Sequence, residues 1–298
     1  MLAGQPGHPV AVRKVDAELV LVAGGVGLVV AFDQCVRQLG PGEVFQVFGL
    51  GFLTLGRAMA VVGLSTLIFL PLAVTIGLRP RWAALLQDAR AAQDAIRAEP
   101  LLGGLIHSSL LHHASMERAL AYRFSMKLAS SEMSEQILRE IADQAYDSDP
   151  ELGAAARADL MAIYDRDPAC HRYLQPILFF KGYQAVQAYR IGHWLWQQGR
   201  RDMAYFVQMR VSEVFGVDIH PGARVGKGIM IDHAHSIVIG ETAVVGDNVS
   251  MLHSVTLGGT GKEDGDRHPK IGNGVLIGAG AKVLGNIHVG HCSRIAAG

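Results

Sequence analysis

Ile277-Gly-Ala-Gly-Ala-Lys282 is one of a run of hexads, each opened by Ile or Val, that starts at residues 271, 277, 283, 289 and 295. The same period runs from Ile219 through Val225 to Ile231, and again, after a two-residue slip, from residue 239 through 245 to 251. A period of six matches neither strand alternation nor the α-helical repeat. It is typical of a solenoid in which each hexad forms a short strand and a corner, so that three hexads form a coil of about eighteen residues.

This repeat also predicts which side chains face inward. The Ile or Val that opens each hexad stacks on its equivalent one coil away, and the glycines stand at corners, where positive φ and close backbone approach are tolerated. An ordinary sandwich with Gly-rich turns would instead show strand alternation and irregular spacing. We therefore predict a parallel β-helix for the C-terminal part of the chain. A loop from Gly258 to Lys270 interrupts its repeat.

Composition limits the classes of function. The chain has 298 residues, half of them apolar, which suggests about two domains with a sizeable core. Its formal net charge is zero, so nothing recommends nucleic acid as a partner. The three cysteines, Cys35, Cys170 and Cys292, are widely spaced, which argues against a disulfide scaffold and a Cys-rich metal site and fits a reducing compartment.

The first residues differ from the rest, and we treat 1–81 as an apolar N-terminal extension. Residues 58–78 carry no charge and are flanked by Arg57, Arg79 and Arg81. A bilayer core of about 30 Å needs about twenty such residues. A membrane-associating segment, a buried helix and a fusion remnant all remain open interpretations. If the segment spans a membrane, the arginines after it keep the following chain in the cytoplasm.

Residues 82–205 have the pattern of a helical domain. Apolar residues recur at helical spacing from Leu105 to Leu128, and Ser131 is placed to cap the next helix. Asp149-Pro150 reads as an N-cap and a first helical residue. A last amphipathic helix is expected over about 180–198. These apolar stripes exceed what one small bundle needs, so we expect assembly of several subunits through this domain.

Polar residues that can take part in catalysis or ligand binding are concentrated in the repeat region, 206–298. Asp218 lies at its entrance, and Asp232 and His233 are adjacent. Because Asp218 and His233 are fifteen residues apart, nearly one coil, we expect them to meet as a base and its orienting carboxylate. A structural alternative stays open, in which Asp218 caps the turn into the solenoid. Asp167, which precedes a proline, would by default cap a helix.

A histidine column is the basis of a metal alternative. Allowing for the slip, His233 and His253 occupy equivalent positions on successive coils. With His235 they offer three imidazoles, the ligand type of a carbonic-anhydrase-like zinc site. A corner histidine is more often solvated or packed, and suitably spaced ligands from adjacent subunits are not evident.

Several longer strings resemble those of bacterial serine O-acetyltransferases, from about Trp82 to Gly298. They are Arg190-Ile-Gly-His-Trp-Leu-Trp196, Val217-Asp-Ile-His-Pro221, Gly228-Ile-Met-Ile-Asp-His-Ala234, Ile239-Gly-Glu-Thr-Ala-Val244, Ser254-Val-Thr-Leu-Gly-Gly-Thr-Gly-Lys262 and Asp266-Arg-His-Pro-Lys-Ile271. The resemblance implies an α + β fold, with an N-terminal all-helical domain followed by a left-handed parallel β-helix of hexapeptide repeats. It implies transfer of an acetyl group from acetyl-CoA to the hydroxyl of L-serine in L-cysteine biosynthesis, without an acyl-enzyme.

The same resemblance assigns the site. His233 matches the general base and Asp218 its paired carboxylate. Asp167 and Asp232 match the groups that bind the serine amino group, and Arg267 and His268 those that hold its carboxylate. This is physically sensible because a zwitterion needs carboxylates at one end and a guanidinium at the other.

The resemblance also implies partners and a co-substrate site. Gly259, Ala279 and Gly280 correspond to residues near the thioester and pantetheine arm of acetyl-CoA, in a groove between neighbouring β-helices. No metal is expected. The implied assembly is a trimer or a dimer of trimers in the cytoplasm, with L-cysteine as a feedback inhibitor.

The C-terminal end departs from the family pattern, because the family's β-helix continues past the point that Gly298 reaches. We therefore expect part of the CoA groove wall to be missing, together with the tail that docks into O-acetylserine sulfhydrylase. Two alternative functions remain open. One is another hexapeptide-repeat acetyltransferase, acting on a sugar or an antibiotic. The other is a scaffold that does not bind CoA.

Overall fold

The computed structural model describes residues 52–60, 91–261 and 264–298. The chain divides into two compact units, Met1–Arg79 and Pro80–Gly298. In the first unit, residues 52–60 are helical. Most of the predicted membrane-associating segment 58–78 lies outside the described residues. Within those that are described, no helix is long and apolar enough to cross a membrane.

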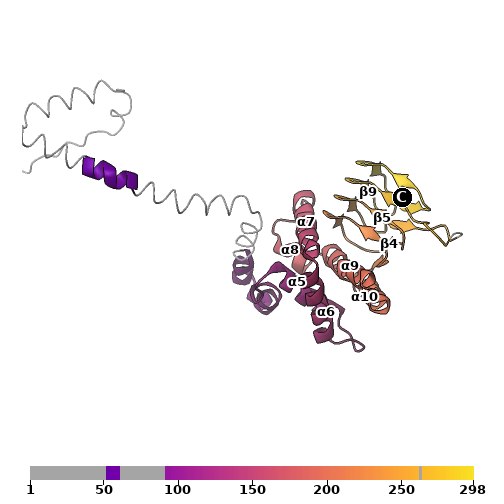
Figure 1. Cartoon of the computed structure of the whole chain (residues 1–298), viewed down its shortest axis with the longest axis horizontal. Coiled ribbons are helices and arrows are strands. Elements are labelled where there is room, and N and C mark those ends of the chain that lie inside the picture. The colour runs from indigo at the N-terminus through magenta and orange to yellow at the C-terminus, as the bar shows by residue number, and fades with distance from the viewer. Residues whose placement is uncertain (1–51, 61–90, 262–263) are drawn as a thin grey trace, which may run out of the picture. The chain divides into compact units, whose positions relative to one another are not determined.

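The second unit begins with helices. After a helical stretch at residues 91–98, they are the 3₁₀ helix η1 (Pro100–Leu102), α4 (Gly103–Ile106), the π-helical turn η2 (His107–Leu111), α5 (Met116–Leu128), α6 (Glu135–Ser148), α7 (Pro150–Arg166), α8 (Leu174–Leu178), α9 (Lys181–Gln197) and α10 (Arg201–Phe215). Figure 1 shows α9 and α10 next to the strands, with α5 and α6 on their other side.

Capping residues set several of these helix starts. Asp149 caps α7 by accepting a hydrogen bond from the Glu151 amide, and Pro150 is the first helical residue, which confirms that prediction. The cap of α6 is Ser134 rather than Ser131. The sequence pattern from Leu105 to Leu128 is broken after the π-helical turn, and a new helix begins at Met116.

The sequence pattern predicted neither α8 nor α10. Helix α10 continues past the expected domain boundary at 205/206 and ends at Phe215. It stops because Gly216 adopts a left-handed conformation, φ 69°, which closes the helix and turns the chain into the first strand. The helical region therefore extends directly to the β-helix.

The remaining chain is a left-handed parallel β-helix with three sides, as predicted. Its strands are β1 (Val217–Ile219), β2 (Arg224–Val225), β3 (Met230–Ile231), β4 (Ile237–Ile239), β5 (Val244–Val245), β6 (Ser250–Met251), β7 (Thr256–Gly258), β8 (Lys270–Ile271), β9 (Leu276–Ile277), β10 (Lys282–Leu284), β11 (His288–Val289) and β12 (Arg294–Ile295). Every third strand joins the same four-stranded sheet. Sheet A contains β1, β4, β7 and β10, sheet B contains β2, β5, β8 and β11, and sheet C contains β3, β6, β9 and β12.

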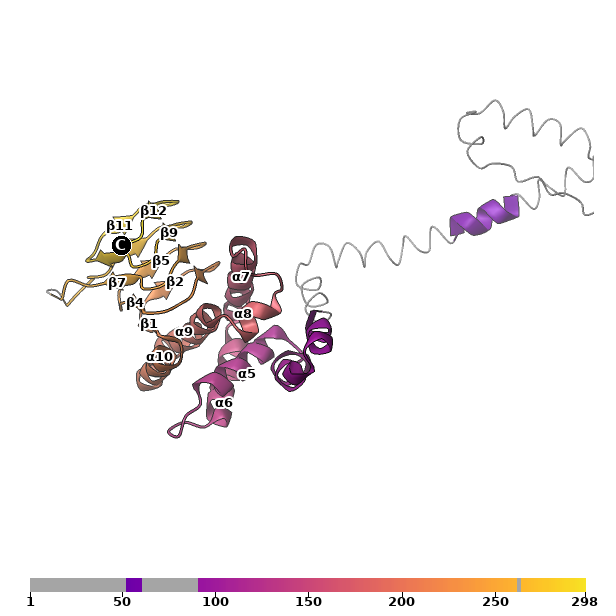
Figure 2. The ribbon, with the colours of Figure 1, turned by 180° about the vertical axis from the view of Figure 1, so that it is seen from behind.

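The strand register confirms the hexad repeat. Val217 pairs with Ile237, twenty residues on, and Val238 pairs with Thr256, eighteen residues on. The next step in sheet A, from Thr256 to Lys282, is twenty-six residues, because the loop at 258–270 is inserted there. In Figure 2 the coils stack away from α9 and α10, with β1 nearest to the helices.

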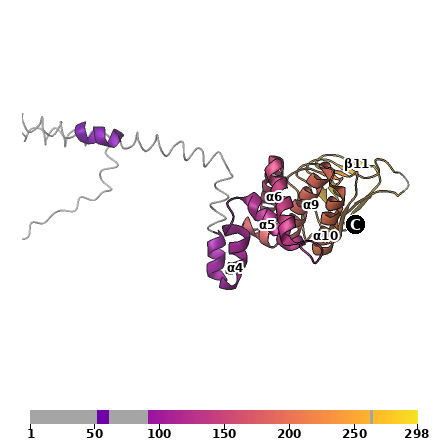
Figure 3. The ribbon, with the colours of Figure 1, turned by 60° about the horizontal axis from the view of Figure 1, so that its bottom comes forward.

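The two regions share one hydrophobic core. Three residues that open hexads, Ile239, Val245 and Met251, are at most 2% exposed. These inward-facing side chains of the β-helix form one hydrophobic cluster with buried residues of α9 and α10. Figure 3 shows α9 and α10 side by side against the strands.

A buried ion pair holds the helices to the β-helix. The carboxylate of Asp159, in α7, accepts two-pronged hydrogen bonds from Arg190, in α9, and their side chains are 0% and 8% exposed. The Asp159 carboxylate also accepts the amide of Ile229, and Arg190 donates to the carbonyl of Gly226. Two helices and one turn of the β-helix therefore meet at a single charge pair.

We expect Asp159→Ala to destabilise the protein by about 3–5 kcal/mol, because the variant leaves the Arg190 guanidinium buried without its counter-charge. The free energy of unfolding measured by urea denaturation tests this. Asp94→Ala is the control, because Asp94 pairs with Arg97 on the exposed surface and its loss should leave stability unchanged. Equal stability of the two variants would contradict the role given to this ion pair.

Candidate functional site

Apart from Asp218, the predicted site residues of the β-helix lie at two of its corners. The turn from sheet C to sheet A carries Asp232 and His233 on the first coil, His253 on the second, and Ala279 and Gly280 on the third. We name these five residues the His233 corner. Along this column, the amide of Gly280 donates a hydrogen bond to the carbonyl of His253. The candidate base and the residues expected near acetyl-CoA are therefore aligned along one edge of the β-helix.

The turn from sheet A to sheet B carries the second set. It contains Glu241 and Thr242 on one coil, and Gly259, Arg267 and His268 in the inserted loop of the next coil. We name these five residues the Arg267 corner. Since sheet A lies between the two corners, one chain does not bring its predicted base and its predicted carboxylate-binding groups together.

His233 is open to solvent at its corner. Its side chain is 72% exposed, and its Nε2 lies 3.6 Å from a carboxylate oxygen of Asp232. Its ring packs against the ring of His253, with centroids 5.9 Å apart and planes at 67°. Such edge-to-face geometry is favourable. An accessible imidazole with a carboxylate beside it can accept a proton from a bound hydroxyl.

Asp218 does not pair with His233 in the structure. It lies in β1, where its ladder neighbour is Val238, and its carboxylate accepts a hydrogen bond of 2.6 Å from Gln208 of α10. Among the described residues, no hydrogen bond or ion pair joins Asp218 to His233. The carboxylate beside the imidazole is that of Asp232.

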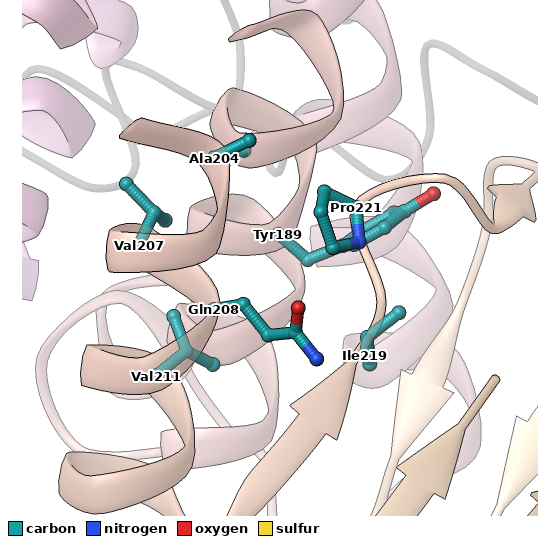
Figure 4. Close-up of a pocket in the computed structure, with 8 residues that line it drawn as sticks. Tyr189, Ala204, Val207, Gln208, Val211, Ile219 and Pro221 are labelled. Carbon is teal, nitrogen blue, oxygen red and sulfur yellow. The ribbon is translucent and has the colours of Figure 1, made fainter. Parts of the chain in front are cut away.

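Gln208 belongs to a cavity distinct from both corners. The cavity lies between α9, α10 and the end of β1 and is lined mainly by apolar side chains. Figure 4 shows Gln208 facing Ile219 and Pro221 across it. None of its lining residues belongs to the predicted site, so we regard it as a packing gap.

The Arg267 corner is organised by Thr242. Its hydroxyl oxygen accepts hydrogen bonds from the amides of Arg267, at 3.1 Å, and His268, at 3.2 Å. The Arg267 guanidinium forms a 2.8 Å ion pair with Glu241, and this hydrogen bond holds the pKa of Glu241 below its ordinary value. The inserted loop is thus tied to the preceding coil by two adjacent residues.

Hydrogen bonds fix the tautomer of His268. Its Nδ1 accepts a hydrogen bond from the amide of Thr242, at 3.2 Å, so the ring proton lies on Nε2. The ring is 6% exposed and fills the space above Gly240, where a Cβ would meet Nε2 at 1.9 Å. Burial, followed by the charge of Arg267, lowers the pKa of His268. His268 therefore offers a single N–H donor beside a guanidinium, which suits a carboxylate.

His220 lies one coil below this corner. Its Nδ1 accepts the amide of Gly222, at 3.0 Å, and its ring stands edge-on to Trp196 and Tyr205. Burial lowers its pKa, against the opposing effect of the charge on Glu241. It supports the coil on which Glu241 stands.

Asp167 ends a helix rather than starting one. It is the C-cap residue of α7, and its carboxylate accepts the amide of Ala169 at 2.8 Å. The neighbouring Arg166 donates to Ser250, in sheet C, and to the side chain and carbonyl of Asn248. Asp167 is thereby attached to the sheet whose strands lead into the His233 corner.

The metal alternative finds no support in this arrangement. The part of the chain that the structure describes contains no cluster of three or more His, Cys, Asp or Glu residues placed to hold a metal ion. His235, the third candidate ligand, lies against Gly216, where a Cβ would be 3.5 Å from its Nδ1.

The sequence interpretation missed Thr242 and Glu241 as site residues. Both lie within the hexad string that opens at Ile239. Counting hexads places residues 240–243 at the same corner as the inserted loop, one coil earlier. That count was the signal that could have identified them.

Comparisons with known proteins agree on one family. Residues 82–188 match the family model described as serine acetyltransferase, N-terminal. The chain is 54% identical over 217 residues to the serine acetyltransferase of Salmonella typhimurium, covering 73% of this chain and 78% of that protein.

Solved structures give the same result. A Brucella abortus serine acetyltransferase in complex with coenzyme A is 50% identical, with a TM-score of 0.71, and covers 74% of this chain and 87% of that one. The Neisseria gonorrhoeae protein in complex with serine is 52% identical, with a TM-score of 0.71 and coverages of 72% and 88%. A serine acetyltransferase in complex with cysteine is 47% identical, with a TM-score of 0.71 and coverages of 72% and 89%.

The lowered pKa values of His220 and His268 predict that stability falls with acidification. Below the ordinary histidine pKa of about 6.5 the unfolded chain binds more protons than the folded one, so unfolding becomes more favourable as the pH falls. We expect the melting temperature to decrease between about pH 7.5 and about pH 5.5. His268→Asn, whose side-chain oxygen replaces Nδ1 as acceptor, should show a shallower decrease. A melting temperature that increases as the pH is lowered from about 7.5 to about 5.5 would contradict the assignment.

Proposed function

This chain belongs to the serine acetyltransferase family, and from that premise we infer that its two corners together transfer the acetyl group of acetyl-CoA to the hydroxyl of L-serine. It is an acyltransferase with acetyl-CoA as co-substrate. The observation that carries the site assignment is the pair of opposite charge environments, an exposed imidazole with Asp232 at one corner and Arg267 with the Nε2–H of His268 at the other.

Each group of the substrate has a proposed partner of suitable charge. The serine carboxylate pairs with the guanidinium of Arg267 and accepts from Nε2 of His268. The serine ammonium pairs with Asp232 and Asp167. This orientation directs the hydroxyl toward His233.

The proposed reaction is a direct attack. His233 takes the hydroxyl proton while the seryl oxygen bonds to the thioester carbonyl carbon, giving a tetrahedral oxyanion that backbone amides near Gly259 stabilise. The carbon–sulfur bond then breaks, and the imidazolium returns its proton to the leaving thiolate. Asp218, whose carboxylate accepts a hydrogen bond from Gln208 in this structure, is proposed to favour the imidazolium through its negative charge. No metal takes part.

The separation of the corners supports a site shared between subunits. Base and carboxylate-binding groups from one chain stand on opposite sides of sheet A, so a second copy is needed to supply the missing half. A ring of three chains closes this head-to-tail contact. We therefore propose a trimer or a dimer of trimers.

Acetyl-CoA is proposed to lie between the same two chains. Gly259 is close to the side chains of Arg267 and His268, at 3.2 Å and 3.3 Å from its Cβ position. Ala279 and Gly280 lie one coil after His253 at the other corner. A groove between two copies brings these residues to one ligand.

Three further parts of the proposal concern regulation, location and domain use. L-cysteine shares the amino and carboxylate groups of serine, so it competes for the same partners. Cys170 and Cys292 are free thiols, which supports a cytoplasmic location. The helical region, 82–205, is proposed to serve assembly and to supply Asp167, and 206–298 to carry the other residues of the site.

We expect His233→Ala to lower kcat by about 10²–10⁴-fold, because the general base is lost. Thiol release from acetyl-CoA, with serine and with sugar acceptors, measures this. The control is His288→Ala, at an exposed position of sheet B, which should retain wild-type turnover. Normal serine acetylation by the His233 variant would refute the assignment, and a preference for sugars would support another hexapeptide-repeat acetyltransferase. Failure of the wild-type chain to bind CoA would support the scaffold.

We expect inactive His233→Ala and Arg267→Ala chains to restore activity when they are unfolded and refolded together. In a ring where each site takes one corner from each neighbour, random mixing leaves about a quarter of the sites intact. Each variant refolded alone is the control. No recovered activity in mixed oligomers would place both groups of a site on one chain.

A further inference from the structure

We propose that Gly182, the second residue of α9, is a positioning residue for the base. Its missing side chain lets α9 press on the turn that carries His233 and hold that turn in a left-handed conformation. The inference rests on the proposed function, in which His233 accepts the hydroxyl proton.

The turn has an unusual backbone. His233, Ala234 and Ser236 all have positive φ, at 57°, 44° and 54°. Residues with a Cβ rarely adopt this region, and a cluster of such residues persists only where the surroundings enforce it. The turn is also tight, because the amide of Ala234 donates to the carbonyl of Asp232 at 2.6 Å. A particular contact must therefore compensate for this conformation.

Helix α9 makes that contact at Gly182. A Cβ added there would lie 2.1 Å from the carbonyl oxygen of Ile231 and 3.1 Å from the Cβ of Ala234. Neither atom can rotate away, because one belongs to the backbone and the other is attached to it. Ile231 precedes the base and Ala234, which is fully buried, follows it. The helix thus braces the backbone on both sides of His233 and leaves the ring exposed.

The helix itself cannot easily yield. Arg190 anchors it to the Asp159 carboxylate and the carbonyl of Gly226, and Tyr189 donates from its hydroxyl to the carbonyl of Ala223 at 2.5 Å. The hydrogen bonds to Gly226 and Ala223 attach α9 to the same β-helix that carries the turn. A side chain at Gly182 therefore displaces the turn, whose outer side faces solvent.

Another glycine of the same helix provides a matched control. A Cβ at Gly192 would lie 3.4 Å from a methyl group of Val207, which is an ordinary contact. Alanine raises helix propensity at either position. A difference between the two alanine variants therefore reports the contact with the turn and not the helix.

The test is steady-state kinetics of the full chain carrying Gly182→Ala or Gly192→Ala. We expect Gly182→Ala to lower kcat by about 10²-fold, as a displacement of about 1 Å of a reacting group does, while the KM for acetyl-CoA stays within about twofold. Gly192→Ala should have the kcat of the wild type. A Gly182→Ala enzyme within about threefold of wild-type kcat would overturn the proposal.

Ala234→Gly decides the matter if Gly182→Ala does not fold. Glycine tolerates positive φ, so the chain should keep its melting temperature, yet the turn loses the methyl group that α9 braces. We expect kcat to fall by at least about fivefold; unchanged kcat would overturn the proposal. His233→Ala, assayed beside these variants, tests the proposed function itself. If His233→Ala retains activity, the assignment of His233 as the base is refuted. If His233→Ala is inactive while Gly182→Ala is fully active, only the positioning role of Gly182 is refuted.

Discussion

The charge pair between Asp159 and Arg190 is the contact on which the arrangement of this unit depends. Burying two ions is costly unless every hydrogen-bonding group is used, and here the carboxylate also accepts the Ile229 amide while the guanidinium also reaches the Gly226 carbonyl. An apolar contact would tolerate sliding of α9 over the coils. A pair with this many directional bonds allows one register, so helix and β-helix are set relative to each other.

That register has consequences for the proposed chemistry. With α9 fixed on the first coil, Gly182 lies against the turn before and after His233, and the strained turn is braced from inside. The base then stands on a rigid support although its own ring is exposed. Rigid support of an exposed group is what general-base catalysis needs, since a shift of about 1 Å costs much of the rate.

The Arg267 corner is held together by different interactions. The inserted loop is attached to the preceding coil through the hydroxyl of Thr242 and the carboxylate of Glu241, so Arg267 and His268 are presented by side-chain hydrogen bonds and not by the repeat. The two corners are consequently independent structural units on either side of sheet A. This explains how a repeat with a uniform cross-section can carry an asymmetric, zwitterion-binding site in the proposed trimer.

The sequence alone determined the β-helix, its three sides and the interrupting loop, because a six-residue period fixes which side chains point inward wherever the strand is placed. Family strings added the expected site residues and the confirmed family. Neither source determined the partner of Asp218, the bracing by Gly182, or the division of the site between two corners. These depend on how α9 and α10 pack on the coils and on backbone distances between segments remote in sequence, and no local period encodes such distances.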